Sequence, residues 1–359
     1  MSALTADTLA AQDASTSAAI IDYLNADEDF LRLSKSEAAL IVGRDEEDAV
    51  KLRAGIQISI DAGVLPADAG AAPYVTIDVL GKTPDEVCDV IVAHVGSAAE
   101  TGCVLVLCGL SGTGKGTTVA KLQERLPNTV SLAVAWQRRR GVAVRIVAVA
   151  RVRPAPAPPR PPLTPHPPPT PQVTWSNGNV FRSLTLLAAT WCEQQGMAAF
   201  DGAAALTAPN LADFMGMLAF EKIDGEWDIK ITGLGLDLRV SQVKNTDLKG
   251  PKVAKNIPTV AERTQGDVVN FAAAATKKMG ADGLNVLLEG REATVDYVPT
   301  PYRYTLTMSD TIVLGQRRAA QRLAAAAQAL VAALGNTPDG NAVKDAVTSS
   351  LATMVGEMA

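Results

Sequence analysis

A glycine-rich turn between an apolar run and an amphipathic segment constrains this chain more than any other feature. Residues 103–108 are six consecutive apolar residues, typical of a strand that is buried on both faces of a parallel sheet. Residues 109–115 follow as Gly-Leu-Ser-Gly-Thr-Gly-Lys, after which valine and leucine recur at helical spacing up to residue 126. The sequence therefore predicts a strand, a tight turn and a helix over residues 103–126.

A turn of this kind is suited to holding a phosphate group. Its backbone N–H groups surround the anion, and the N-terminus of the helix adds further donors and a positive dipole. Lys115 would bring a mobile positive charge to the outer phosphates, although Gly116 stands where the usual motif has Ser or Thr. A chance glycine turn is the alternative, and the flanking strand and helix argue against it. The predicted phosphate-binding residues are Gly109, Ser111, Gly112, Thr113, Gly114, Lys115, Gly116, Thr117 and Thr118.

Composition narrows the class of protein. The chain has 359 residues, enough for one large or two modest domains. Its net charge of −5 argues against nucleic acid as a bulk partner, and no apolar run approaches the length of a membrane span. The four cysteines show no metal-ligand spacing, which fits a reducing compartment. The first 31 residues lack Lys and Arg, so we expect no signal or transit peptide and a cytoplasmic location.

Strand and helix signals alternate along the chain, which predicts an α/β fold with a parallel sheet. Residues 1–17 are expected to fray, and residues 18–62 follow a helical pattern. An Asp-Gly turn at 224–225 predicts antiparallel strands over 219–243. The strands of the parallel sheet are expected at 74–79, 103–108, 129–136, 285–289 and 302–308, and further helices at 84–95, 181–194, 210–218, 258–279, 316–334 and 340–358.

Residues 137–175 do not match their surroundings. Residues 137–173 hold seven Arg, 11 of the 21 Pro and no Lys, Asp or Glu, in a chain of net charge −5. So many prolines exclude a helix or a central strand and predict polyproline II or disorder. The segment could be a ligand for an SH3-type module, a lineage-specific insertion or an in-frame retained intron. Its removal would join the strand at 129–136 directly to the next predicted loop.

Two arginine motifs follow predicted strands. Arg182 ends an Asn-Gly-x-x-Phe-Arg motif, and Arg291 lies in a Glu-Gly-Arg-Glu motif directly after the strand at 285–289. Open α/β sheets bind ligands beyond the carboxyl ends of their strands, and a guanidinium holds a phosphate through two parallel hydrogen bonds. Each arginine alone would be an ordinary surface residue, but together with the turn they indicate transfer of a phosphoryl group between small molecules. A third set lies in the helix at 316–334: Arg317, Arg318 and Arg322.

These motifs resemble those of the cytidylate kinase family. That family typically has glycine after the lysine of its phosphate-binding loop, as this chain has Gly116. The motif at 177–182 resembles the family's Ser-Gly-x-x-Tyr-Arg, and the motif at 289–292 resembles its Asp-Gly-Arg-Asp. The antiparallel segment at 219–243 is similar to the family's small insert. The resemblance covers residues 104–322, interrupted by the proline-rich segment.

The resemblance implies a P-loop NTPase three-layer sandwich with a five-stranded parallel sheet, a small antiparallel β insert and a lid. It implies an ATP:CMP phosphotransferase of pyrimidine nucleotide metabolism that uses ATP and Mg²⁺ and accepts CMP, dCMP or UMP. We expect a monomer with nucleotides as ligands, no membrane or nucleic-acid partner, and no metal held by protein side chains alone. The implied catalytic residues are Lys115, Arg182 and Arg291, and the implied acceptor-binding residues are Asn177, Gly178, Arg182, Gly290, Arg291 and Glu292.

Two departures from the family matter. The family's cytosine-reading positions fall around residues 256–263, where this chain has no residue-by-residue match, so the base preference stays open. After Arg322 the family continues into an arginine-rich lid, a strand and a helix, which are missing there. Residues 44–51, Arg-Asp-x-x-Asp-x-x-Lys, are similar to that lid, although a solvated helix face is the plainer interpretation. The lid candidates are Arg44, Asp48 and Lys51, or else Arg318 and Arg322.

We therefore hypothesise a circular permutation, in which the lid and the edge strand precede the phosphate-binding loop. It predicts that the strand at 74–79 lies beside the strand at 302–308 and that Arg44 points into the cleft. A kinase of another small acceptor and a catalytically silent nucleotide-binding structural or regulatory protein stay open as alternatives. The predicted regions are 1–73 (helical, candidate lid), 74–136 (edge unit and loop core), 137–175 (disordered insertion), 176–284 (acceptor-binding region with the β insert) and 285–359 (core strands and last helices).

Overall fold

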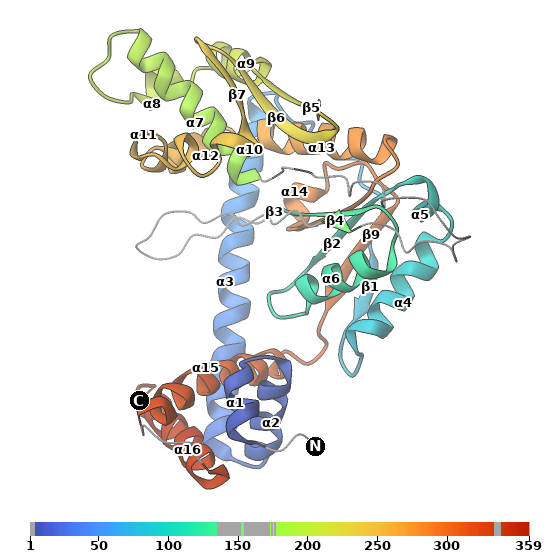
Figure 1. The fold of residues 1–359 in the computed structure, drawn as a ribbon, viewed down its shortest axis with the longest axis vertical. Coiled ribbons are helices and arrows are strands. Elements are labelled where there is room, and N and C mark those ends of the chain that lie inside the picture. Colours follow the sequence, from blue (N-terminus) through green and yellow to red (C-terminus); the bar gives the residue numbers. More distant parts are fainter. Residues whose placement is uncertain are drawn as a thin grey trace, which may run out of the picture.

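A sheet of five parallel strands forms the centre of the fold, as predicted. The structure, a computed structural model, describes residues 4–134, 152–153, 173, 175, 177–333 and 339–358. The parallel strands have the order β1-β9-β2-β8-β3, and a short strand, β4, pairs antiparallel with β3 at the edge (Figure 1). Their bounds are β1 (Val75–Asp78), β2 (Val104–Gly109), β3 (Thr129–Val134), β4 (Val152–Arg153), β8 (Asn285–Gly290) and β9 (Tyr302–Thr307).

Helices cover both faces of the sheet, which explains why β2 is apolar at every position. Val106 and Cys108 belong to one buried cluster, together with residues of α7 (Asn177–Gln194) and α13 (Gln265–Ala281). Leu105 and Leu107 point to the other face and belong to a second cluster, with α4 (Pro84–Val95) and α6 (Lys115–Arg125). A strand between two helical layers has no side for polar residues.

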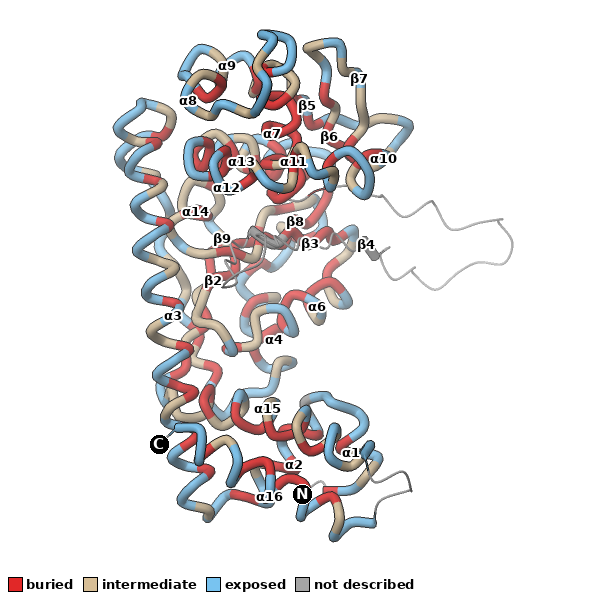
Figure 2. Tube along the Cα trace, turned by 90° about the vertical axis from the view of Figure 1, so that its left-hand side faces the viewer, coloured by how far each residue is buried: buried red, intermediate tan, exposed pale blue. Residues whose placement is uncertain are grey.

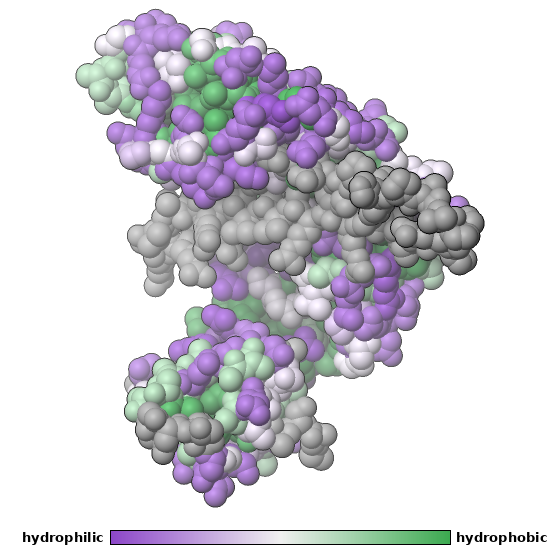
Figure 3. Space-filling view, in the orientation of Figure 1, coloured by the Kyte–Doolittle hydropathy of each residue, from purple (hydrophilic) through white to green (hydrophobic). Residues whose placement is uncertain are grey.

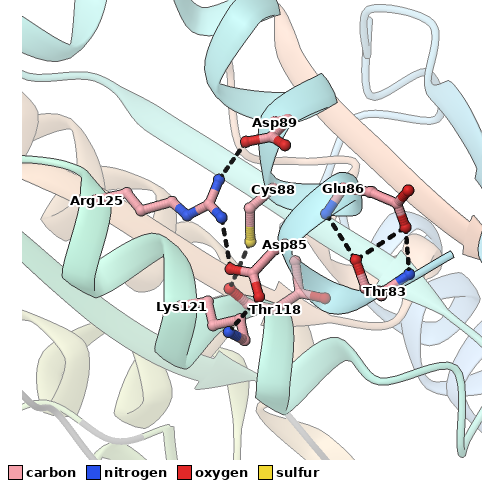
Figure 4. Close-up of polar contacts among 8 residues, drawn as sticks. All are labelled: Thr83, Asp85, Glu86, Cys88, Asp89, Thr118, Lys121 and Arg125. Carbon is pink, nitrogen blue, oxygen red and sulfur yellow. Dashed lines mark hydrogen bonds and ion pairs between the residues drawn. The ribbon is translucent and has the colours of Figure 1, made fainter.

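The strand–helix unit before the turn is part of this sheet. β1 pairs in parallel with β9, so the predicted neighbourhood of these strands is confirmed. α4 begins with a capping box, in which Thr83 Oγ1 accepts from the N–H of Glu86 and the Glu86 carboxylate accepts from the N–H of Thr83. Asp85 and Asp89 of α4 then pair with two cations of α6, Lys121 and Arg125 (Figure 4).

The expectation that residues 1–17 fray is wrong for the described residues. α1 (Ala6–Ala11) and α2 (Ala14–Leu24) form a helical bundle with the first half of α3 (Glu28–Asp61), α15 (Ile312–Ala333) and α16 (Gly340–Gly356) (Figure 1). Leu9 is buried in it, and Gln12 Nε2 donates to the carbonyl of Ala324. The helical pattern expected over 18–62 is confirmed, and it belongs to two helices, because Asp27 caps α3 by accepting from the N–H of Phe30.

α3 runs as a long rod from this bundle, past the sheet, to α12 (Ile257–Arg263) and α13 (Figures 1 and 2). Glycine permits the close contact at each end. A Cβ on Gly315 of α15 would lie 1.9 Å from the carbonyl oxygen of Ser34, and one on Gly266 of α13 would lie 2.4 Å from Cβ of Ser59. Ser59 Oγ also accepts from the N–H of Gly266 at 3.0 Å. α3 is therefore held at both ends by contacts that a larger side chain would break.

The predicted antiparallel insert is confirmed as a separate sheet of three strands, β5 (Leu218–Ile223), β6 (Glu226–Gly233) and β7 (Leu236–Arg239). Asp224 and Gly225, at positive φ, make its first turn. Residues 240–243, expected as strand, form a helix instead, and the helix expected at 258–279 breaks at Thr264. The remaining short helices are α5 (Ala98–Thr101), α8 (Gly202–Ala205), α9 (Ala208–Gly216), α10 (Val240–Val243), η1 (Asp247–Lys249), α11 (Pro251–Ala254) and α14 (Glu292–Val295).

The predicted end of the proline-rich insertion, residue 175, is too late in the chain, because Val173 and Trp175 belong to the core. Trp175 is buried, stacks on Phe271 with ring centroids 5.7 Å apart and meets Phe220 edge-on at 5.1 Å. Val173 is buried as well and forms a β-bridge with Trp227. Removal of all of 137–175 would therefore take two side chains out of the core. Residues 135–151 and 154–172 lie outside the described residues.

Hydrophilic residues cover most of the described part of the face in Figure 3, and hydrophobic ones show between them at the helical bundle and near the β insert. Among the described helices, none combines the length and the apolar character that crossing a bilayer requires.

The close crossing of α3 and α15 predicts a difference between two glycines. Gly315→Ala is expected to lower the free energy of unfolding by about 1–3 kcal/mol, because the added methyl group must push α15 away from Ser34. Gly43→Ala in α3 is the matched control, since no atom lies within 4 Å of its Cβ position and alanine favours the helix. Urea unfolding followed by circular dichroism measures both variants. Equal effects of the two substitutions would contradict the close crossing.

Candidate functional site

The glycine-rich turn lies at the carboxyl end of β2, in the middle of the sheet. Gly109 closes the strand at φ 136°, and a Cβ there would lie 2.2 Å from the carbonyl oxygen of Leu306. Gly112 and Gly114 also have positive φ, 88° and 87°. α6 begins at the next residue, Lys115, so the predicted strand, turn and helix are confirmed. At Gly109, only glycine combines such a backbone angle with so close an approach to β9.

Lys115 folds back into the turn. Its Nζ donates to the carbonyls of Gly109 and Leu110 at 2.9 and 2.8 Å. Burial lowers the pKa of Lys115, while the charge of Glu289 at the end of β8 acts in the opposite direction. Burial likewise raises the pKa of Glu289, against the charges of Lys115 and Arg291. The turn thus holds an ammonium group and a carboxylate that solvent reaches poorly.

A carboxylate from α3 is bound at the same turn. Asp45 Oδ2 accepts from the backbone N–H of Ser111 at 2.6 Å, and Oδ1 accepts from the hydroxyl of Ser111 at 2.8 Å. Arg291 donates from both terminal nitrogens, Nη2 to Oδ1 at 2.8 Å and Nη1 to Oδ2 at 3.1 Å. The Asp45 side chain is 2% exposed. An anionic ligand is bound by donors of this kind: a loop N–H, a hydroxyl and a bidentate guanidinium.

The charge states of this pair follow from the contacts. Burial on its own would raise the pKa of Asp45, but the hydrogen bonds from Arg291 and Ser111 outweigh it and lower the pKa. The hydrogen bond to Asp45 in turn raises the pKa of Arg291. Both groups are therefore charged at neutral pH.

Arg303, on β9, fixes the segment that follows Arg291. It is fully buried, and its Nη2 donates to Tyr74 Oη at 2.6 Å and to Asp296 Oδ1 at 2.7 Å. It also donates to the carbonyls of Val295 and Val298, at the end of α14 and just beyond it. These bonds hold α14 against the sheet and so limit where Arg291 can lie.

Other predicted residues of the turn have structural contacts. The Thr113 hydroxyl donates to the carbonyl of Leu110 at 2.8 Å and closes the turn from inside. Thr117 is exposed, whereas Thr118 is buried and its carbonyl accepts from the thiol of Cys88 (Figure 4). Gly116 is exposed and has no atom within 4 Å of its Cβ position. Thr117 is therefore the hydroxyl after Lys115 that a ligand from solvent could reach.

The predicted acceptor-binding residues of α7 form their hydrogen bonds within or next to their own helix and not with Arg291. Arg182 Nη1 donates to Asn179 Oδ1 on its own helix at 3.1 Å, and burial lowers the pKa of Arg182. Asn177 and Gly178 are buried, and the Asn177 side chain accepts from Trp175 Nε1. On the other side, Gly290 ends β8 and the carboxylate of Glu292 accepts from the Thr305 hydroxyl at 3.4 Å.

The predicted lid residues differ in their positions. The Arg44 side chain is 56% exposed, and its Nε lies 4.0 Å from Asp45 Oδ1. Lys51 Nζ pairs with Glu47 Oε2 on the same helix at 3.6 Å. Asp48 acts on Arg291 through its charge. Arg322 pairs with Glu37 inside the helical bundle instead of over the turn, and Arg318 is exposed. Of the motif at 44–51, Asp45 is the residue that reaches the turn.

Sequence reasoning missed three functional candidates: Asp45, Glu289 and Arg303. In the sequence, Asp45 looks like one member of a solvated charged run, and Glu289 looks like the first residue of the motif around Arg291. Arg303 could have been found from the sequence, because it is a charged residue inside a predicted buried strand.

No protein-family model matches the chain, and a search of curated proteins finds no significant match. Within the described residues, no group of three or more His, Cys, Asp or Glu could hold a metal ion.

Burial of Glu289 predicts a pH-dependent effect of Glu289→Gln. The raised pKa of Glu289 means that the folded state keeps the proton to a higher pH than the unfolded state. Stability therefore falls as pH rises above the unfolded pKa of about 4.3, and Gln removes this loss. Glu289→Gln is expected to be more stable than the native chain near pH 8 and equal to it near pH 4. Urea unfolding at several pH values, with the exposed Glu221→Gln as control, measures this. A gain that does not change with pH would contradict it.

Proposed function

We propose that this chain is a nucleotide phosphotransferase of the cytidylate kinase type, which moves the γ-phosphoryl group of ATP to a nucleoside monophosphate. One observation carries the proposal. A loop N–H, a serine hydroxyl and the guanidinium of Arg291 converge on one anion at the carboxyl end of the central strand. Donors that bind a carboxylate in this way can also bind phosphate oxygens.

The donor nucleotide would lie over the turn. The loop from Gly109 to Gly114 would cradle its phosphates, and the N-terminus of α6 would add its dipole. Lys115 would leave the two carbonyls and follow the transferring group. Mg²⁺, when bound, neutralises phosphate charge and takes most of its ligands from phosphates and water, so it needs few protein side chains.

The acceptor phosphate would be held by Arg291, with Arg182 as a second cation once α7 approaches. The acceptor phosphate is already a nucleophile, so the reaction needs no general base from the protein. Positioning and charge stabilisation are then the whole contribution of the protein. Glu292 would contact the sugar or base, as the resemblance implies, and CMP, dCMP and UMP are all candidate acceptors.

A circular permutation accounts for the order of the elements along the chain. β1 precedes the turn in sequence but forms the edge of the sheet beside β9, which supports the proposal. α4 ends at Val95 and β2 begins at Val104, so the connection between them is short. A short connection is expected where two neighbouring ends have been joined.

A second candidate function has its own observation. Asp45 occupies the donors that a phosphate would use, which favours a nucleotide-binding protein without catalysis if the carboxylate never leaves. Both candidate functions use the glycine-rich turn to bind a nucleotide, but only the phosphotransferase would turn over an acceptor.

A phosphotransfer assay with Mg-ATP against CMP, dCMP, UMP and AMP tests the proposal. We expect turnover with a pyrimidine acceptor, and Lys115→Ala is expected to lower kcat about 10²–10³-fold, since it removes a charge from the transition state. Lys121→Ala on the same helix is the matched control, because Lys121 pairs with Asp85 on the surface, and it should stay within about twofold.

ATP binding without turnover of any acceptor would support the binding protein instead. The absence of both binding and turnover would contradict both candidates. Turnover that survives Lys115→Ala unchanged would contradict the role given to this lysine.

A further inference from the structure

We infer that Asp45 is a built-in competitor for the phosphate at the glycine-rich turn, so that a nucleotide binds only after α3 has moved Asp45 away. The inference rests on the proposed function for the identity of the ligand. The competition itself rests on the contacts of one carboxylate.

The donors cannot serve two anions at once. The backbone N–H of Ser111 has one hydrogen, which it donates to Asp45 Oδ2, with 2.6 Å between the nitrogen and the oxygen. The same carboxylate takes the hydrogen of the Ser111 hydroxyl and one N–H from each terminal nitrogen of Arg291, the pair of donors that a phosphate would use on that edge of the guanidinium. A phosphate placed among these donors would meet a buried negative charge as well as the loss of its hydrogen bonds. Binding and the Asp45 contacts therefore exclude each other.

The short side chain of Asp45 cannot withdraw far while α3 stays in place. Its position is set by a rod that is fixed at Ser34 against Gly315 and at Ser59 against Gly266. Asp45 lies between these two contacts, about 16 Å along the helix axis from Ser34 and about 21 Å from Ser59. Release of the carboxylate thus calls for a displacement of the middle of α3 relative to the sheet.

One displacement would open two subsites. When Asp45 leaves, the Ser111 N–H becomes free at the turn, and the edge of the Arg291 guanidinium that binds Asp45 becomes free at the end of β8. The first belongs to the proposed donor site and the second to the proposed acceptor site. The contact therefore couples the two sites, and a ligand that displaces Asp45 prepares the other site for its own anion.

Asp45→Asn tests the competition with ADP as the probe, measured by calorimetry. Removal of the competing charge is expected to tighten ADP binding about tenfold or more. Glu46→Gln is the matched control, since it removes one negative charge from the next residue, whose side chain is exposed, and it should change the affinity less than about twofold. Equal or weaker ADP binding by a folded Asp45→Asn protein would overturn the inference.

A distance measurement covers the case in which Asp45→Asn does not fold. The four native cysteines are buried, so spin labels on Glu46→Cys in α3 and Ala120→Cys in α6 can be attached selectively. Pulsed electron spin resonance should show a changed distance between the labels when ADP is added to saturation. An unchanged distance with ADP bound would overturn the inference.

Failure of the proposed function gives a different result. If ADP does not bind but pyrophosphate binds more tightly to Asp45→Asn than to the native chain, the competition stands and the nucleotide function fails. If neither probe binds to any variant, the inference is overturned as well.

Discussion

The carboxylate of Asp45 joins three parts of the molecule that are far apart in sequence. Its partners, Ser111 and Arg291, lie 66 and 246 positions away, one after the central strand and the other after its neighbour. A buried carboxylate is stable only when its oxygens are fully hydrogen-bonded to cations or N–H groups, and Asp45 meets this condition. Together with the packing of α3 on α14, this contact holds the middle of α3 beside the sheet.

Each end of α3 packs on a helix that is connected to a strand beside the glycine-rich turn. One end lies in a helical bundle with α15, which follows β9 directly, and the other packs on α13, which leads into β8. Both β8 and β9 flank the strand that carries the glycine-rich turn. A shift of α3 would therefore be felt at both neighbours of the turn. The Asp45 contacts at the turn would therefore change when α3 shifts relative to the sheet.

The local elements around the site could be predicted because their causes are local. β2 is apolar at each position since helices cover both of its faces, and Gly109, Gly112 and Gly114 are required by backbone angle. The hairpin at Asp224 and Gly225 follows from turn chemistry. The place of β1 beside β9 came from a resemblance, and the observed pairing agrees with it.

What the sequence could not predict depends on distant partners. Asp45 stands in a run of charged residues that a solvated helix would also have, and only its tertiary contacts distinguish it from Glu46 and Glu47. Trp175 follows a run of prolines, yet its aromatic partners Phe220 and Phe271 make it a core residue. Arg303 is a charge inside a strand, and its meaning depends on Tyr74 and Asp296.

A crystal structure of the chain with ADP and Mg²⁺ bound tests the central claim most directly. We predict that a phosphate oxygen accepts from the N–H of Ser111 and that the Asp45 carboxylate has left both Ser111 and Arg291. A structure in which Asp45 keeps these bonds while ADP occupies the turn would contradict the account. So would a structure in which ADP binds elsewhere and the turn still holds Asp45.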